Sequence, residues 1–342
     1  MAVATRVTRR LLGLWLVCGA LGCSRSSGPT TPGPSTPAAF STAVRVIDAI
    51  TASTVSGVTA TGDGVSGTAS STAGTMTVGA AAGSVSARAV TFTRAGYVTR
   101  TVAMKIPGNE IAVSMIPSTF HLDAYDELLR APRLQRWTSA PPLRVQTRTL
   151  QFIAVTQSDA AAIDEVMSDD DRLGLEADLS WALPQLTGNT FASFAGITRE
   201  TVEVDGRMQV LNTGMITVAR YAGLTAATGY WGYSRWQFRT DGTVIGGTIM
   251  LDRDFDRSGT ATRRSLRAHE LGHALGYTHV TLLTSVMNRN AVTEPNTFDR
   301  QATQVAFLRP PGNVRLDSDP AEASLNRLGA AIWSRGEGAR RR

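Results

Sequence analysis

Hydrophobic and polar positions alternate with a period of two through the first third of the chain. Short runs rich in β-branched residues are separated by glycines and by an Asp-Gly pair, as in Val44–Ile47, Val85–Phe92 and Ile111–Ile116. Alternation of this kind between turn residues is typical of half-buried strands. The pattern predicts a small all-β sandwich that acts as an accessory domain over residues 42–117.

The second part of the chain contains hydrophobic patterns typical of strands and others typical of helices. Alternating or continuous apolar runs predict strands at Leu143–Val155, Thr201–Val204, Met215–Val218 and Val244–Asp252. Apolar residues three and four apart predict helices at about Asp123–Leu129, Thr262–Leu275 and from Asn296 or Thr297 to Phe307. Ser158 can cap a further helical region, with a break, that reaches about Leu183. We expect an α+β domain at residues 143–319, with a connector at 118–142 before it and a basic tail at 320–342 after it.

The composition and the N-terminal residues indicate that the protein is exported. The chain has 342 residues, of which 42% are hydrophobic and 18% charged, so it can form two domains with real cores. Three arginines precede Leu11–Leu21, an apolar run that is too short to span a bilayer and indicates a targeting segment. Ala20-Leu21-Gly22-Cys23 resembles the lipobox of bacterial lipoproteins, in which the cysteine is lipidated and becomes the new N-terminus.

The resemblance implies a lipoprotein signal peptide at residues 1–23 and a Ser/Pro/Thr-rich tether at 24–41. We therefore expect a protein that is anchored to the membrane through a lipidated Cys23, on the cell envelope or surface. Ordinary secretion after cleavage nearby is the alternative. Ala95-Gly96-Tyr97-Val98 in the sandwich is similar to carboxypeptidase-regulatory-like or transthyretin-like accessory domains, which are spacers or adhesive modules; a sandwich without a binding role is the alternative.

Charge and cysteine content exclude several kinds of function. The formal charge is +6, but the arginines are scattered and no basic stripe carries interleaved aromatics, so we expect no nucleic-acid partner. Both cysteines, Cys18 and Cys23, precede the predicted domains. The domains therefore lack a disulfide, a thiolate metal site and a cysteine nucleophile.

Three of the four histidines fall in the stretch His269-Glu270-Leu271-Gly272-His273-Ala274-Leu275-Gly276-Tyr277-Thr278-His279. His269 and His273 are four apart on a predicted helix, so both imidazoles project from one face and can bind one zinc ion. Gly276 permits a left-handed turn at the helix end, which brings His279 back as a third ligand. Three protein ligands leave an open position for water, as in catalytic zinc sites, and Glu270 can take the proton of that water.

Histidines on an apolar helix are often simply core residues, but Leu271, Ala274 and Leu275 already supply the apolar face here. The spacing HExxHxxGxxH resembles the zinc-binding motif of the metzincin metalloproteases. That resemblance implies that His269, His273 and His279 are zinc ligands and that Glu270 is the general base. It also implies a metzincin-like fold, with a mixed twisted sheet, a backing helix and a zinc-site helix.

Met287 follows the motif at the distance of the matrixin branch, and the resemblance makes it the methionine that lies beneath the metal; ordinary core packing would place it similarly. Departures from the family matter too. No cysteine precedes the domain, so latency through a zinc-bound thiolate is excluded. Arg289 stands where an astacin-like tyrosine ligand would be, and His121 is the only spare histidine, so no second zinc is expected.

Three further sites are predicted with less support from the residues. By resemblance, Gly247, Thr248 and Ile249 belong to an edge strand that pairs with an extended substrate; an ordinary sheet strand is the alternative. Asp252, Asp254 and Asp256 alternate in a way that suits Ca²⁺, with a solvated acidic loop as the alternative. Asn288–Val292 is expected to wall the pocket for the substrate residue after the scissile bond. The aromatics Tyr230, Trp231, Tyr233 and Trp236 are assigned to packing.

Together these features predict an exported zinc-dependent metalloendopeptidase, which cleaves protein or peptide substrates with a zinc-activated water and Glu270 as general base. Two alternatives use the same residues. One is a surface-anchored binding or adhesion lipoprotein with a structural or vestigial zinc site, which the intact Glu270 disfavours because a structural site needs no base. The other is a zinc hydrolase that acts on a non-peptide amide, and the sequence leaves it open.

Overall fold

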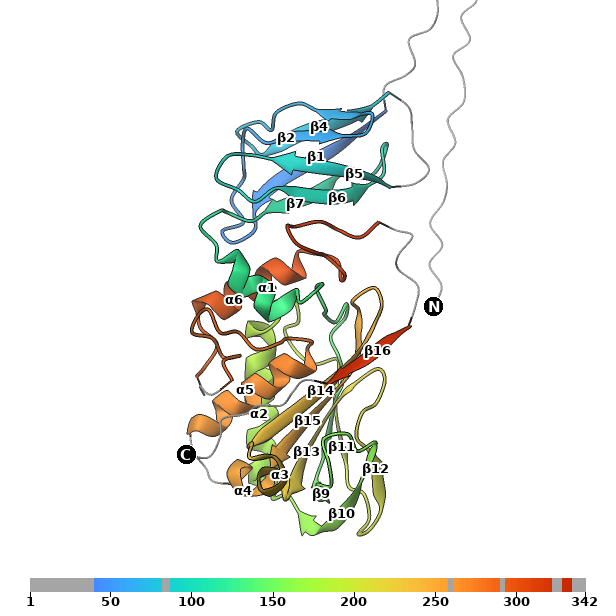
Figure 1. Ribbon diagram of the computed structural model, residues 1–342, viewed down its shortest axis with the longest axis vertical. Helices are drawn as coiled ribbons and strands as arrows, with labels where there is room; N and C mark the ends of the chain where they lie inside the picture. Colours follow the sequence, from blue (N-terminus) through green and yellow to red (C-terminus); the bar gives the residue numbers. More distant parts are fainter. Residues whose placement is uncertain (1–39, 82–86, 258–260, 290–292, 322–327, 334–342) are drawn as a thin grey trace, which may run out of the picture. The chain divides into compact units, whose positions relative to one another are not determined.

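The computed structural model describes residues 40–81, 87–257, 261–289, 293–321 and 328–333 (Figure 1). The predicted signal peptide with Cys18 and Cys23, and the tether up to residue 39, lie outside the described residues. Residues 38–342 group into one compact unit. None of the helices in the described ranges is both long and apolar enough to cross a membrane.

The N-terminal part is all-β, as the alternating pattern predicts, but its strands form one sheet. The strands are β1 (Phe40–Asp48), β2 (Thr59–Gly62), β3 (Val65–Gly67), β4 (Thr75–Ala80), β5 (Arg88–Thr93), β6 (Arg100–Met104) and β7 (Ile111–Met115). They are hydrogen-bonded in the order β6-β5-β2-β3-β4-β1-β7. The expectation of a sandwich of two separate sheets is therefore wrong in detail, because one continuous path of strands curls into a nearly closed, barrel-like sheet around its apolar side chains (Figure 1).

The second part combines helices with a nine-stranded sheet. Its strands are β8 (Leu143–Gln146), β9 (Arg148–Gln151), β10 (Asp159–Val166), β11 (Ile197–Glu200), β12 (Arg207–Gln209), β13 (Ile216–Ala222), β14 (Gly232–Arg239), β15 (Val244–Asp252) and β16 (Leu328–Trp333). The main path runs β12-β10-β9-β13-β15-β14-β16, and β8 joins β13 to β11. β13 and β15 are parallel, whereas β14 is antiparallel to both β15 and β16.

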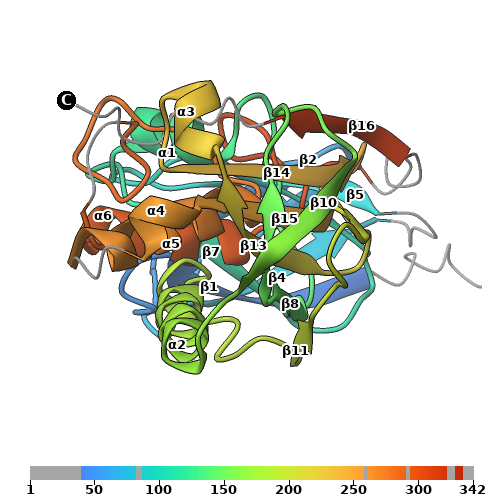
Figure 2. The same cartoon turned by 90° about the horizontal axis from the view of Figure 1, so that it is seen from below.

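The helices are α1 (Leu122–Leu129), α2 (Asp169–Gln185), α3 (Leu224–Thr228), α4 (Arg253–Asp256), α5 (Ala261–Ala274) and α6 (Thr297–Phe307). Figure 2 shows α2 and α5 on the same side of the second sheet, where α5 packs against β14 and β15. Buried residues of α2, α5, α6 and the sheet share one apolar core. The described chain is thus a mixed α and β protein with two sheets, which confirms the broad class predicted from the sequence.

One predicted helix begins later than expected. Ser158 precedes a strand, β10, in which Ala160 and Ala162 are buried and Ala161 between them is partly exposed. The helix α2 starts only at Asp169, where the side chain of Ser168 accepts a hydrogen bond from the Asp171 backbone N–H. The alanines at Ala160–Ala162 are compatible with the hydrophobic period of a helix or of a strand. Pairing with β9 stabilises the strand.

A buried network of charges connects the two sheets through the chain after α6. Arg309 donates to both oxygens of Asp317, at 2.8 Å each, and to the Ser114 hydroxyl on β7 at 2.6 Å. Arg100 on β6 pairs with Asp317 and Asp319. Buried charges are tolerated only when each has a partner, so the network specifies how this segment joins the first sheet.

We therefore expect Asp317→Asn to lower the free energy of unfolding by about 3–5 kcal/mol, because it leaves buried guanidinium groups without their counter-charge. Denaturant unfolding monitored by tryptophan fluorescence measures the change. The matched control is Asp164→Asn, which removes an exposed carboxylate paired with Arg148 and should cost less than about 1 kcal/mol. Equal effects of the two substitutions would contradict the role given to Asp317.

Candidate metal centre

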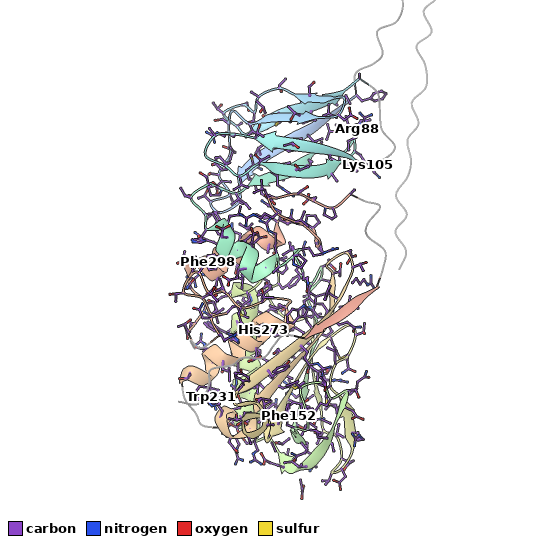
Figure 3. The ribbon with its side chains drawn as sticks, viewed as in Figure 1. Arg88, Lys105, Phe152, Trp231, His273 and Phe298 are labelled. Atoms are coloured by element: carbon purple, nitrogen blue, oxygen red, sulfur yellow. The ribbon has the colours of Figure 1, made fainter. Side chains whose placement is uncertain are left out.

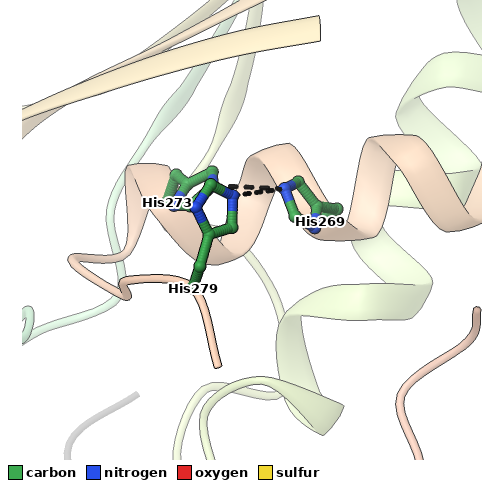
Figure 4. A group of neighbouring side chains, drawn as sticks. All are labelled: His269, His273 and His279. Carbon is green, nitrogen blue, oxygen red and sulfur yellow. Dashed lines mark hydrogen bonds between the residues drawn. The ribbon is translucent and has the colours of Figure 1, made fainter. Parts of the chain in front are cut away.

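Helix α5 presents two histidines to one point. His269 and His273 are one turn apart, both are buried, and their Nε2 atoms lie 3.1 Å from each other (Figure 4). Figure 3 places His273 in the part of the molecule built on the second sheet. The apolar residues of α5 that pack into the core, including Leu271 and Ala274, leave the histidine face turned toward the chain that follows the helix.

The third histidine arrives through a sharp reversal. Gly276 has φ +108°, so the left-handed turn predicted at the helix end is confirmed. The Tyr277 backbone N–H donates to the Gly272 carbonyl and closes the helix, and the Thr278 N–H donates to the Leu128 carbonyl of α1. His279 then lies with its Nε2 3.1 Å from that of His273 and 3.3 Å from that of His269.

The tautomers of His269 and His273 are those that suit metal binding through Nε2. His269 Nδ1 is 2.7 Å from the Val286 carbonyl, and His273 Nδ1 is 2.7 Å from the Tyr277 carbonyl. A carbonyl oxygen only accepts, so both Nδ1 atoms carry the proton and both Nε2 atoms present bare lone pairs. Ligands at about 2.0–2.1 Å from a tetrahedral metal lie about 3.4 Å apart, close to the separations found here. The three-histidine group can therefore hold a metal ion.

Burial keeps the three rings neutral, as metal ligands must be. Desolvation lowers the pKa of His269 to about 4 against the opposing effect of its bond to Val286, and lowers the pKa of His279 to about 3. The pKa of His273 lies well below its usual value for the same reason and because the neighbouring rings repel a further charge. At neutral pH no proton therefore competes with a cation for these nitrogens.

The turn around Met287 supports this centre from below. Met287 is buried, and its thioether packs against Gly272 between the two helical histidines, where a side chain on Gly272 would collide with it. Asp299, at the start of α6, accepts hydrogen bonds from the Ser285 hydroxyl and the Val286 N–H. Since the Val286 carbonyl receives the His269 proton, Asp299 orients a metal ligand through one peptide group.

Glu270 follows His269 on α5, and its side chain contacts β14. One carboxylate oxygen, Oε2, accepts a hydrogen bond from the Ser234 hydroxyl at 2.7 Å, whereas Oε1 is buried and has no hydrogen-bond partner among the described residues. Gly232 on the same strand leaves room for the carboxylate, because a Cβ there would collide with it. Burial raises the pKa of Glu270 to about 8, against the bond from Ser234, and a nearby dication would lower it again.

The residues predicted to bind calcium do not come together. Asp252 caps α4 by accepting from the N–H groups of Asp254 and Phe255, and Asp254 pairs with the neighbouring Arg253. Asp256 is buried between Arg220 and Arg267, at 2.7 and 2.8 Å. The three carboxylates therefore serve different partners and do not form one group that could hold a metal ion among the described residues. The pair with Arg267 anchors α5 two residues before His269.

The predicted substrate strand is not at an edge. Gly247, Thr248 and Ile249 pair with β13 on one side and with β14 on the other, so their backbone groups are already used. The pairing of β14 with β15 was not predicted from the sequence, in which the aromatics of this region form one dense group. Trp236 and Phe238, two residues apart, belong to the core shared with α5, and this spacing was the available signal.

The aromatic residues serve different parts of the fold. Trp236 lies parallel to His273 with ring centroids 6.2 Å apart, and its Nε1 donates to Gln135. Trp231 stacks on Phe255 at 4.3 Å, whereas Tyr233 packs into the core on the opposite face of the sheet. Of the predicted pocket wall, Asn288 and Arg289 line a surface hollow of about 560 Å³ after His279, and residues 290–292 lie outside the described residues.

We expect the full chain to hold one equivalent of a divalent transition metal, such as Zn²⁺, and His279→Ala to lose it, because two imidazoles bind far more weakly than three. Metal analysis after dialysis measures both. Chelation should also lower the melting temperature of the wild type, since three lone pairs would then face one another unscreened. The control is His121→Ala, which removes the fourth histidine, a cap of α1. Metal retained by His279→Ala at one equivalent would refute the three-histidine centre.

Comparisons with known proteins add no family to this geometry. No family model matches the chain, and no curated protein matches it. Among solved structures, the chain is similar to the Bacillus anthracis TIE protein, at 8% identity and a TM-score of 0.18, over 61% of this chain and 41% of that one. The chain thus spans less than half of that protein, and a likeness this distant supports no conclusion about fold or function.

Proposed function

We propose that this protein is a zinc-dependent metalloendopeptidase with a metzincin-like, matrixin-like catalytic unit. The observation that carries the proposal is a buried carboxylate with one unpartnered oxygen, Glu270 Oε1, on the residue that follows His269 in α5, the helix that carries two of the three converging imidazoles. A structural metal site gains nothing from a buried acid beside it, and burial of that acid costs free energy unless it has a task.

Zinc suits these ligands because imidazole nitrogen is among its preferred donors and three protein ligands leave one position open. When bound, zinc supplies a Lewis acid that polarises a carbonyl and makes water acidic enough to act as a nucleophile near neutral pH. His269, His273 and His279 are the ligands in this proposal, and Met287 and Asp299 keep them in place.

Glu270 is the general base. Its Oε2 is held by the Ser234 hydroxyl, which fixes the plane of the carboxylate and leaves Oε1 free to take a proton from water. The same carboxyl then returns that proton to the amine that leaves as the peptide bond breaks. Burial of the residue on all sides excludes bulk water from this transfer.

The proposal includes export of the enzyme, on the basis of the first 23 residues. A lipidated Cys23 and the tether at residues 24–41 would then hold it at the cell envelope or surface. Its partners are protein or peptide substrates outside the cytoplasm. A zinc hydrolase of non-peptide amides would use the same residues, and the substrate assay below separates the two.

Glu270→Gln should retain the metal and lower kcat for peptide cleavage by about 10²–10⁴-fold, because the amide cannot accept the proton. Cleavage of a peptide library with mapped cut sites, together with metal analysis, measures the effect. Metal in both proteins with cleavage in neither would refute the peptidase and favour a binding protein with a structural site. Cleavage that is unchanged in Glu270→Gln would refute the role of Glu270.

Ser234→Ala should lower kcat by about tenfold or more with little change in KM, since a hydrogen bond to a charged group contributes about 1.5–3 kcal/mol. The matched control is Ser70→Ala, which removes a buried serine whose hydroxyl donates to the Val55 carbonyl in the first sheet. Steady-state kinetics of both variants decide: equal losses would mean that Ser234 acts only through general stability.

A further inference from the structure

The strand that covers the metal centre is β14. Two of its side chains, Ser234 and Trp236, reach Glu270 and His273, and its inner edge pairs with β15 throughout. Its outer edge is therefore the side of the second sheet next to the candidate catalytic residues. An extended polypeptide that adds to a sheet edge gains backbone hydrogen bonds along its whole length.

That outer edge already carries a strand from the same chain. β16 pairs with it antiparallel, with Leu328 opposite Arg239, Ala331 opposite Gln237, Ile332 opposite Trp236 and Trp333 opposite Arg235 (Figure 1). The paired segment ends one residue before the level of Ser234. It reads Leu-Gly-Ala-Ala-Ile-Trp, with no charge and no proline, so the sequence is suited to strand pairing.

The segment also lies far from β14 in the sequence. Leu328 comes nine residues after Asp319, which belongs with Asp317 to the buried charge network described above. Trp236 of β14 and Ile249 and Leu251 of β15 belong to the apolar core that they share with α5. What β16 adds is an occupant of an edge that would otherwise offer free N–H and C=O groups next to the metal centre.

We propose that Leu328–Trp333 is an autoinhibitory strand, which occupies the edge of β14 in place of an extended peptide substrate. The inference rests on the proposed peptidase function and deepens it: substrate and β16 compete for the same backbone groups. The substrate class that fits is an extended, unfolded or loop segment of a protein, because a folded helix cannot pair with a strand edge.

The expected change in KM follows from the covalent connection between β16 and the rest of the chain. A segment joined by a short linker has an effective concentration of about 1 mM, so a strand whose free peptide binds at about 0.1 mM would weaken substrate binding about tenfold. Competition of this kind raises KM and leaves kcat unchanged. It also leaves the metal ligands untouched.

The test compares two truncations of the full chain. A chain that ends at Ala321 lacks β16, whereas the control that ends at Trp333 keeps it and loses only residues 334–342. We expect the first to cleave an extended peptide with a KM about tenfold lower than the wild type at equal kcat and equal metal content, and the second to behave as the wild type. Ala331→Pro in the full chain, which disrupts backbone pairing opposite Gln237, should reproduce the shorter truncation.

A binding measurement keeps this test independent of catalysis. A fluorescent peptide with the sequence of residues 328–333 should bind the chain that ends at Ala321 at least several-fold more tightly than the chain that ends at Trp333. Hydrogen exchange of the β14 amides that face β16 should rise in the shorter chain, while α5 stays protected.

The outcomes separate the two proposals. If no variant cleaves any peptide but the shorter chain binds the labelled peptide more tightly, β16 does occupy the edge of β14 in competition with other extended segments, but the peptidase proposal fails and the inhibitory role fails with it. If the two truncations show the same KM, the same peptide binding and the same exchange at β14, the strand is not an inhibitor and the inference is overturned.

Discussion

Three imidazole Nε2 atoms converge at one spot, 3.1 to 3.3 Å from one another, and this convergence is the constraint on which the arrangement around α5 depends. The tautomers of His269 and His273 follow from two backbone carbonyls, those of Val286 and Tyr277, which can only accept. Both carbonyls belong to the chain after the helix. The geometry of the centre therefore depends as much on the turns around Gly276 and Met287 as on the helix that carries two of the ligands.

Several contacts around α5 hold the helix and the following turn in this arrangement. Arg267 ties α5 to Asp256 and Asp178, and Asp299 ties the turn before α6 to the metal side of the helix. Each is a buried charge with a partner, which is costly to desolvate but specifies one arrangement of helix and turn. β14 completes the site from above, since Gly232 makes room for Glu270 and Ser234 binds it.

The same strand connects the proposed chemistry with its proposed control. An edge that lies close enough to the metal to receive a substrate is also open to any other extended segment, including one from the same chain. Neither predicted domain contains a cysteine that could bind the metal as a thiolate. A strand that pairs with β14 would restrain activity by backbone hydrogen bonds instead, and it would yield to a substrate that pairs better.

The sequence by itself determined what is local. The three ligands, Glu270 and the left-handed glycine lie within eleven residues, so helix periodicity and one turn suffice to bring them together. Helices α5 and α6 and strand β15 were likewise evident from their own periodicity. Only the tertiary structure decided which strand lies over the site, because Ser234 is 36 residues from Glu270 and the pairing of β14 on both sides is set by long-range packing. The roles of Asp252, Asp254 and Asp256 also depend on the tertiary structure. Asp256, for example, pairs with Arg220, which lies 36 residues earlier in the sequence.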